Sequence, residues 1–440
     1  MSDLRNYISI LENSGDLTTI TKQVSTKYEI ASITSKVDGL SAILFDNIAE
    51  SDFRLVSNLV GSKNRFAQAL NATVSTIHDK IIQSIDIAEK PKLLQDGLFL
   101  KNQSTSASIL PVVTHFEKES GPFITSSIVH VKNPETNEQN SSFHRLMPID
   151  DTHFSIRMVQ ERHLDRCFQS SKQQNCDLPV AITIGVHPAI SIASAYQAVW
   201  GYDEMNIANV LLDKKLSLCK LPNTGLYVPA TTEIVLEGKI LSDVTHEEWM
   251  VEMLQTYDHK RSQPVFELER LYYQDNPIFH DILSGYTEHR LLMGMPIEAK
   301  LNHNLKKLFS DVTSIVLSDG GCNWLHAVVQ IKKTSTSDVP EIINKTFTAH
   351  RSLKQVTVVD IDIDPNSATA IEYAMATRFQ ADKDLLVIHN VRGSSLDPSS
   401  NQDTLTTSKL GIDATIPLDK KSEGFELAHI PFDADLQDYT

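Results

Sequence analysis

The segment NSSFHR, residues 140–145, decides how this chain is interpreted, because an amide, two hydroxyls, an imidazole and a guanidinium occur together in it. His163, Glu204 and the pair Glu247 and Glu252 extend this set of polar groups farther along the chain. Each group by itself is a weak signal, since polar residues are common on protein surfaces. The interpretation therefore depends on their order along the chain.

Asn140, His163 and Glu204 are candidate metal ligands. One amide oxygen, one imidazole and one carboxylate suit a hard divalent ion such as Mn²⁺ or Mg²⁺ that also binds a phosphate. The alternative is that all three are solvated polar residues. Spacing alone favours this alternative, because the chain has no local ligand motif such as HExxH.

Basic residues gather around Arg145 in the sequence. They are His144, Arg157, Arg162 and His163. Grouped cations of this kind can neutralise a phosphate or the carboxylate of a substrate. The alternative is a row of exposed charges along strand edges, which the pattern alone does not exclude.

Glu247 and Glu252 both lie in HEEWMVE, residues 246–252. On a helix their spacing puts them on different faces, so a paired role requires a turn or a loop. The alternative is an amphipathic helix over residues 247–257, with Trp249, Val251 and Leu254 facing inward. The pattern alone favours the helix.

Bulk properties indicate a folded protein of more than one domain. A chain of 440 residues, 41% of them hydrophobic, suggests two or three domains. Its net charge of -16 argues against nucleic acid and anionic membrane as partners. The four cysteines are scattered without a CxxC pair, as expected for reduced thiols in a cytoplasmic protein.

No segment reads as a targeting or membrane-spanning sequence. The first residues, MSDLRNYISILENSGDL, lack the basic-then-apolar order of a signal peptide. The most apolar run, residues 178–196, contains Pro179, Gly185 and Pro188 and reads as a strand, a turn and a helix start. We expect a soluble, cytoplasmic protein without membrane insertion.

Helix and strand patterns predict four regions. Residues 1–107 alternate helices (4–12, 28–37, 63–70) with strands (17–20, 42–45), as in an α/β region. Residues 108–286 are rich in strand signals, which suggests a barrel or folded-over sheet, interrupted by a helix over 190–198. Residues 287–310 are predicted to form a linking helix that is broken at Pro296. Residues 311–440 predict an α/β domain whose chain is loop-like after Val391.

Taken in order, these motifs resemble the UbiD family of decarboxylases, which hold a prenylated flavin mononucleotide (prenylated FMN) and a divalent metal. The family's cofactor strand has Asn five residues before Arg, as Asn140 stands before Arg145. Its metal-binding His falls on His163, and its third ligand, a Glu after an Ala-Ser loop, falls on Glu204. Further segments match in family order: LRNYISILENSGDL, VPATTEIVLEGKIL, EHRLLMGMPIEA, ATRFQADKDLLVI and TSKLGIDAT.

One segment departs from the family pattern. The family carries a Glu-Gly-Pro-Phe-Gly-Glu/Asp turn whose two carboxylates work with the strand Arg. Here Glu247 and Glu252 keep the spacing of those carboxylates, but the Gly and Pro are replaced by bulkier residues. The change puts the loop's backbone in question, or indicates a reshaped substrate pocket.

The resemblance implies a UbiD-like mixed α+β and α/β fold, with a flavin-binding split β-barrel and a C-terminal α/β domain. It implies reversible, non-oxidative decarboxylation of an aromatic or α,β-unsaturated carboxylic acid. Arg145 would hold the substrate carboxylate, Glu252 would supply the proton that replaces CO₂, and Glu247 would orient Arg145. The implied cofactor-binding residues are Asn140, Ser141, Ser142, Phe143, His144, Arg145, Arg162, His163, Glu204, His350 and Arg351.

The resemblance also implies partners. Asn140, His163 and Glu204 would bind Mn²⁺ or Mg²⁺ at the flavin phosphate, with room for K⁺ nearby. A flavin prenyltransferase would supply the cofactor. We expect a homodimer or higher homo-oligomer, with Phe425, Leu427, Ile430, Pro431 and Phe432 of the C-terminal tail docking on another surface.

Two other functions stay open on the sequence alone. The altered glutamate loop is compatible with a non-catalytic relative that binds the cofactor or assists assembly. The same His and carboxylates are compatible with a metal-dependent hydrolase.

Overall fold

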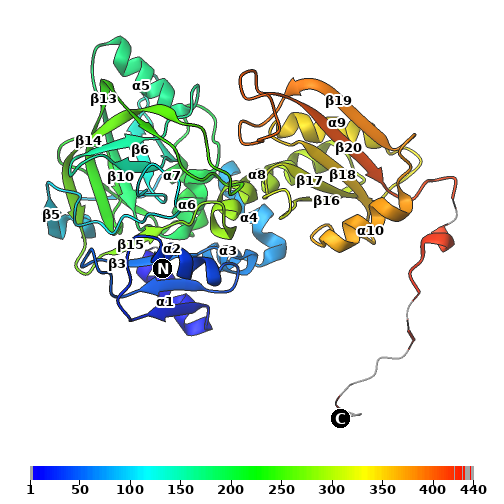
Figure 1. Cartoon of the computed structure of the whole chain (residues 1–440), viewed down its shortest axis with the longest axis horizontal. Helices are drawn as coiled ribbons and strands as arrows, with labels where there is room; N and C mark the ends of the chain where they lie inside the picture. The colour runs from blue at the N-terminus through cyan, green and yellow to red at the C-terminus, as the bar shows by residue number, and fades with distance from the viewer. Residues whose placement is uncertain (1–2, 421, 429, 432–436, 438–440) are drawn as a thin grey trace. The chain divides into compact units, whose positions relative to one another are not determined.

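The computed structural model describes residues 3–420, 422–428, 430–431 and 437. The chain forms two compact units, one of residues 1–303 and 322–324, the other of residues 304–321 and 325–440 (Figure 1). Both units mix helices and sheets, so the predicted mixed α/β class is confirmed. The predicted division at residues 107, 286 and 310 stays a prediction.

The N-terminal part of the first unit is a small α/β layer. Its sheet has the order β1-β2-β3-β15, with β1 Leu17–Ile20, β2 Ala42–Phe45, β3 Arg54–Ser57 and β15 Ile278–Asp281. The helices are α1 Leu4–Ser14, α2 Glu29–Lys36, α3 Lys63–Ala69 and α4 Ile77–Asp86. α1 begins at Asp3, whose side chain accepts a hydrogen bond from the Asn6 N–H, and ends at Gly15 with φ 76°.

An eight-stranded sheet forms the centre of the first unit. Its order is β7-β6-β10-β13-β14-β9-β8, with β5 paired to β14. The strands are β5 Asn102–Ser104, β6 Ile128–Lys132, β7 Gln139–Phe143, β8 Leu146–Pro148, β9 His153–Ile156, β10 Leu178–Ile184, β13 Ile234–Glu248 and β14 Arg261–Tyr273. Within the described residues this sheet does not close into a complete barrel.

Three helices cover one end of β7 and position the polar groups on it. They are α5 His163–Gln173, α6 Pro188–Ala195 and α7 Glu204–Leu211. α6 and α7 share a core with α1, α3 and α4 that includes Leu4, Phe66, Ile190 and Met205. A third sheet, β12-β11-β4, adds β4 Lys92–Leu94, β11 Ser217–Lys220 and β12 Tyr227–Pro229, and short 3₁₀ helices span Val74–Thr76 and Leu98–Lys101.

The helix α8 Thr287–Leu308 is continuous, so the prediction that Pro296 breaks it is wrong. Proline inside a helix removes one hydrogen bond and costs about 3 kcal/mol. Leu291, Leu292 and Met295 are buried on the same helix. Burial of each such side chain contributes about 1.5–3 kcal/mol, which outweighs the cost of the proline.

The second unit is a five-stranded sheet with helices on both faces. Its order is β16-β17-β18-β20-β19, with β16 Val312–Leu317, β17 His326–Ile331, β18 Gln355–Asp360, β19 Leu385–Arg392 and β20 Thr406–Ala414. The helices are α9 Val339–Ala349 and α10 Ala368–Arg378, and a 3₁₀ turn spans Ser422–Phe425. The predicted loop after Val391 is wrong in part, because β20 is an inner strand paired to both β18 and β19.

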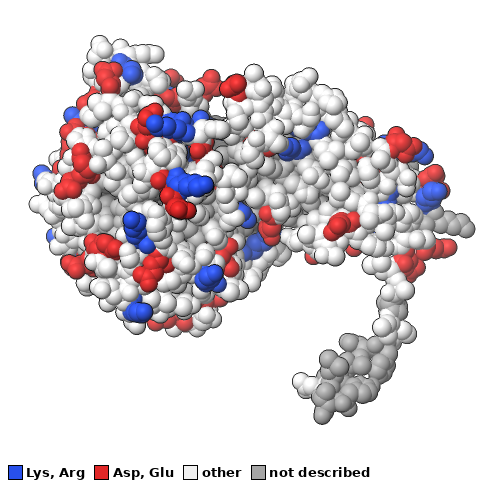
Figure 2. Space-filling model, viewed as in Figure 1, with Lys and Arg blue, Asp and Glu red and all other residues white. Residues whose placement is uncertain are grey.

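The surface carries charges of both signs, in agreement with a composition of 40 basic and 56 acidic residues. On the face shown in Figure 2, acidic and basic side chains are intermingled over both units, and no basic stripe is visible among the described residues there. Within the described part of the chain, no helix combines the length and apolar content needed to cross a bilayer.

Three buried histidines should make the fold less stable in acid. Burial lowers the pKa of His130 to about 3, and it is the largest effect on His144 and His187, whose pKa values fall to about 4. His130 binds the hydroxyls of Ser141 and Thr183 at 2.9 and 3.0 Å, so both ring nitrogens are satisfied in the neutral form. Protonation in the folded state would break this arrangement.

We therefore expect the free energy of unfolding to fall as the pH drops from about 6.5 towards 4, because the unfolded chain binds more protons there. Each histidine contributes up to about 1.4 kcal/mol per pH unit within this window. Thermal unfolding at several pH values measures the slope. His130→Gln should flatten it, whereas replacement of the exposed His259 by Gln should not. An unchanged slope in His130→Gln would contradict the assignment.

Candidate active site

Arg145 lies just beyond β7 at the centre of a cluster of carboxylates. Its Nε–H and Nη2–H donate to Glu248 at 3.1 and 2.9 Å, and its Nη1–H donates to Glu252 at 2.5 Å. The Asp258 carboxylate lies 3.6 Å from Nη2. Burial alone lowers the pKa of Arg145, but the charges of Glu252 and Glu248 outweigh it and raise that pKa. The guanidinium is therefore permanently charged.

The guanidinium keeps some capacity to bind a ligand. An arginine has five N–H groups, and Glu248 and Glu252 use three of them. One N–H on each outer nitrogen is left for a bound anion or for Asp258. A carboxylate bound there would meet a planar, bidentate donor.

The segment after β13 is a turn, so the predicted helix over residues 247–257 is wrong. Val251 forms an antiparallel bridge with Tyr257, and the Asp258 N–H donates to the Met250 carbonyl at 2.8 Å. The Glu252 N–H donates to the Thr256 carbonyl at 2.9 Å. This folded-back turn brings Glu252 and Asp258 to the same side as the end of β13.

The expected role of Glu247 in orienting Arg145 is contradicted by the geometry, and Glu248 makes that contact instead. Glu247 is exposed and pairs with Lys260 at 2.5 Å. Glu248 has a side chain that is 1% exposed and forms the two-pronged ion pair with Arg145. Successive residues of a strand point to opposite faces, so only one of the two glutamates can face Arg145.

Residues 118–120 hold the altered turn in place. The Ser120 N–H and hydroxyl each donate to the Trp249 carbonyl at 3.0 Å, and the Trp249 N–H donates to the Ser120 hydroxyl oxygen at 3.1 Å. The Val251 N–H donates to Glu119 at 3.0 Å, and the indole N–H of Trp249 donates to the Lys118 carbonyl at 2.6 Å. These contacts fix the turn without the glycine and proline of the family pattern.

Asn140, His163 and Glu204 converge in a second cluster at the far end of β7. The Asn140 Nδ2 donates to both oxygens of Glu204 at 2.9 and 3.0 Å and lies 3.2 Å from His163 Nδ1. The Ser141 N–H donates to Glu204 at 2.8 Å. β7 supplies the amide, the first residue of α5 supplies the imidazole, and the first residue of α7 supplies the carboxylate.

This second cluster fits a divalent cation. Glu204 is 2% exposed, and burial raises its pKa well above the usual value. Within the described residues no Lys or Arg pairs with it, so a bound cation would supply the missing positive charge. Rotating the Asn140 amide by half a turn exchanges Nδ2 for Oδ1 and presents an oxygen ligand. No three His, Cys, Asp or Glu side chains of the described chain converge as a metal site, so the fit depends on this amide.

The other predicted cofactor residues lie on β7 or directly after it, between the two clusters. The Ser142 hydroxyl lies 3.4 Å from Asn140 Oδ1 and 2.9 Å from His144 Nε2. His144 Nδ1 lies 2.8 Å from the Arg157 carbonyl oxygen. Phe143 is partly buried against the hydrophobic core.

Residues near α5 complete the surroundings of His163. Arg162 precedes the helix, and its Nη1–H donates to Gln197 at 3.0 Å. The Trp200 ring meets the His163 ring edge-on, with centroids 5.3 Å apart. Trp200 was not expected from the sequence.

His350 and Arg351 belong to the second unit, directly after α9. The Arg351 carbonyl accepts a hydrogen bond from Lys409 Nζ at 2.7 Å. Their predicted contact with the flavin phosphate stays a prediction.

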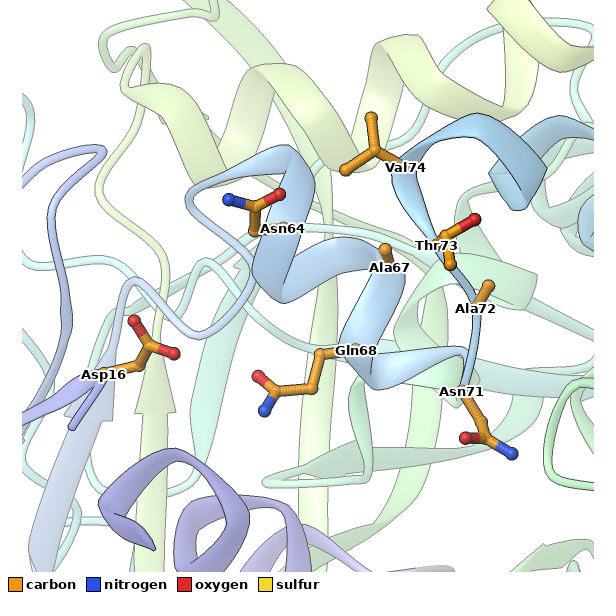
Figure 3. A pocket seen from close by; sticks show the side chains of 8 residues that line it. All are labelled: Asp16, Asn64, Ala67, Gln68, Asn71, Ala72, Thr73 and Val74. Carbon is orange, nitrogen blue, oxygen red and sulfur yellow. The ribbon is translucent and has the colours of Figure 1, made fainter. Parts of the chain in front are cut away.

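A surface hollow of about 470 Å³ lies elsewhere on the first unit (Figure 3). Its side chains come from α3, from the chain that follows it and from the turn after α1 (Figure 3). They are Asp16, Asn64, Ala67, Gln68, Asn71, Ala72, Thr73 and Val74. The hollow shares no residue with the two clusters, and its lining carries one carboxylate and no basic group.

Comparison with known proteins relates this geometry to a family. Three family descriptions match in succession: the N-terminal domain of 3-octaprenyl-4-hydroxybenzoate carboxy-lyase at residues 8–85, its Rift-related domain at 89–287 and its C-terminal domain at 290–414. These descriptions define the UbiD family.

Relatives and solved structures match along nearly the whole chain. The anhydromevalonate phosphate decarboxylase of Methanocaldococcus jannaschii is 39% identical over 414 residues, 92% of this chain and 95% of the relative. That of Methanothermobacter thermautotrophicus is 36% identical over 421 residues, 94% and 97% of the two chains. The UbiD-class enzyme HmfF from Pelotomaculum thermopropionicum, solved in complex with FMN, has a TM-score of 0.96 and 32% identity, with both chains fully covered. An evolved dimeric form of HmfF, solved with prenylated FMN, has a TM-score of 0.92 and 30% identity over the full length of both chains. The chain therefore belongs to the UbiD family and is a carboxy-lyase of that family.

Proposed function

We propose that this enzyme removes CO₂ from anhydromevalonate phosphate with prenylated FMN as its cofactor. The substrate comes from the near full-length similarity to two decarboxylases named for it. This substrate narrows the expected class, an aromatic or α,β-unsaturated carboxylic acid, to a phosphorylated, unsaturated acid. The observation that carries the chemistry is the buried Arg145, held between Glu248 and Glu252 with two N–H groups left over.

The residues of the chain have distinct tasks in this proposal. Arg145 binds the substrate carboxylate, and Glu248 keeps the guanidinium in place. Glu252 carries the proton that takes the position of CO₂. Prenylated FMN, when bound, supplies an acceptor for the electron pair that the departing CO₂ leaves on carbon.

The Asn140 cluster would hold the cofactor. Asn140, His163 and Glu204 would bind Mn²⁺ or Mg²⁺ and so bring a positive charge to the flavin phosphate. A flavin prenyltransferase supplies the cofactor, and the oligomeric state stays a prediction. In the tail Leu427 and Ile430 are 66% and 83% exposed, and Phe432 lies outside the described residues.

The substrate proposal is tested by producing the chain with and without a flavin prenyltransferase. We expect turnover of anhydromevalonate phosphate only in the first preparation, together with the visible absorbance of a bound flavin. A benzoate such as 4-hydroxybenzoate serves as the comparison substrate. Turnover of the benzoate and none of the phosphorylated acid would contradict the proposal. Release of phosphate in place of CO₂, in either preparation, would favour the metal-dependent hydrolase.

The metal site has its own test. His163→Asn and Glu204→Gln should leave a folded protein that no longer retains flavin, because each removes one ligand of the bridging cation. Metal analysis and visible absorbance of the purified variants measure the loss. Gln173→Ala, at the exposed end of α5, is the matched control and should retain both. Full flavin retention in both ligand variants would contradict the assignment.

A further inference from the structure

Arg157 lies beside Arg145 but has no task in the scheme above. It follows β9, and its N–H donates to the Arg145 carbonyl at 3.0 Å. Its own carbonyl oxygen lies 2.8 Å from His144 Nδ1. The backbone therefore fixes Arg157 directly across from the cluster around Arg145.

The guanidinium of Arg157 lacks a carboxylate partner. Its Nη1–H donates to the Met158 carbonyl at 3.1 Å, and no acidic side chain of the described residues forms an ion pair with it. The two neighbouring arginines are both paired, Arg145 with Glu248 and Glu252, and Arg261 with Asp258 at 2.8 Å. A partly buried cation without a counter-ion is costly unless something else neutralises it.

The charges around Arg157 also leave it in a net positive environment. Burial lowers the pKa of Arg157 most, and the positive charges of Arg145 and Arg261 lower it further. Glu252 and Asp258 act in the opposite direction, but the net pKa stays below the usual value. An anion placed beside Arg157 would relieve this repulsion.

The flavin phosphate is poorly placed to be that anion. It is expected at Asn140, near the start of β7, whereas Arg145 follows the end of that strand. Arg157 binds the main chain of Arg145, and the charges that act on it are those of Arg145, Arg261, Glu252 and Asp258. The substrate reaches that end, because its carboxylate is expected at Arg145.

We infer that Arg157 binds the phosphate group of the substrate while Arg145 binds its carboxylate. This inference rests on the proposed function, which gives the substrate two anionic groups at opposite ends of a short chain. Two neighbouring guanidinium groups, one of them without a partner in the protein, match two such groups. Arg157 then distinguishes a phosphorylated acid from its dephosphorylated form.

The test compares two acids on three variants. Arg157→Gln, Arg157→Lys and the control Arg270→Gln, an arginine of β14 away from the cluster, are assayed with anhydromevalonate phosphate and with anhydromevalonate. KM is measured for each acid, or the inhibition constant where an acid is not turned over. Flavin content and the unfolding temperature are recorded for every variant.

We expect Arg157→Gln to raise KM for the phosphorylated acid by about 10- to 100-fold, the usual loss for a charge-assisted hydrogen bond. The values for anhydromevalonate and the flavin content should stay unchanged. Arg157→Lys should restore part of the affinity, because lysine keeps the charge but lacks the planar fork. The control should match the unmodified enzyme with both acids.

Other outcomes would overturn the inference. An equal loss with both acids would show that Arg157 does not recognise the phosphate. A loss of flavin in Arg157→Gln would assign the residue to the cofactor instead. If the unmodified enzyme converts another acid but not the phosphorylated acid, the proposed function itself is overturned. This outcome differs from the other two because it appears without any substitution at Arg157.

Discussion

Replacing Glu252 by glutamine is expected to lower turnover by at least about a hundredfold, because an amide cannot deliver the proton that a general acid supplies. Glutamine keeps an oxygen that can accept the Arg145 Nη1–H, now donated to Glu252 at 2.5 Å. The position of Arg145 should therefore be preserved, and the loss should appear in the chemical step. Incorporation of solvent deuterium into the product should fall together with turnover.

Flavin absorbance and the unfolding temperature separate this loss from damage to the fold. Both should stay close to those of the unmodified enzyme, because the Glu252 side chain is partly exposed and its backbone holds the turn. A Glu252→Gln enzyme that keeps more than about a tenth of normal turnover is hard to reconcile with general-acid catalysis. Glu252 would then only orient Arg145.

Glu248 and Glu247 are neighbours with opposite expected effects. Glu248→Gln removes the buried negative charge that pairs with both Nε and Nη2 of Arg145. We expect a stability loss of about 1–3 kcal/mol and a fall in kcat/KM of at least about tenfold, because Arg145 is no longer fixed. Glu247→Gln removes only an exposed pair with Lys260 and should change stability by less than about 0.5 kcal/mol.

The two variants form a matched pair, since each neutralises one carboxylate at the end of β13. Urea unfolding gives the stability difference, and steady-state kinetics give the difference in kcat/KM. A larger defect in Glu247→Gln than in Glu248→Gln would show that the strand faces Arg145 in the opposite register. Glu247 would then be the residue that fixes Arg145.

The glutamate that contacts Arg145 could not be identified from the sequence. β13 is long, and its pairing with β14 shifts register between Ile240 and Thr245. Glu248 stands at alternate spacing from the buried Leu236 and Ile240, but an irregularity of this kind changes which residues face each side, so the alternation alone does not identify the residue that faces Arg145. The family spacing indicated Glu247, one residue away.

Elements with a strong local pattern were predicted well. Leu4, Tyr7, Ile8 and Leu11 recur at helical spacing and are all buried in α1. β20 was missed because it contains Lys, Gly, Asp and Ala, which are depleted in strands. The packing of α9 against β20 requires a glycine at position 411. A Cβ atom there would lie 2.5 Å from the Ile343 side chain on α9.

The metal cluster was anticipated only through the family resemblance. Its three side chains come from β7, α5 and α7 and meet only when the chain has folded. No spacing rule links such distant positions. Arg157, by contrast, stood in the sequence as one basic residue among several, and its lack of a partner is visible only in the structure.

The contacts that hold the glutamate turn have a consequence for how this enzyme can change. Glu119 and Ser120 bind the main chain of residues 249 and 251, and of the side chains at positions 249–251 only the Trp249 indole takes part in these bonds. Met250 and Val251 instead support the turn by packing, since both are 2% exposed and Met250 packs with Phe123 and Met147. A change in the size of either side chain should lower stability by about 1–3 kcal/mol while the hydrogen bonds to the main chain of the turn stay in place. Substitutions at Glu119 or Ser120, more than a hundred residues earlier in the chain, should instead impair the turnover of every acid alike.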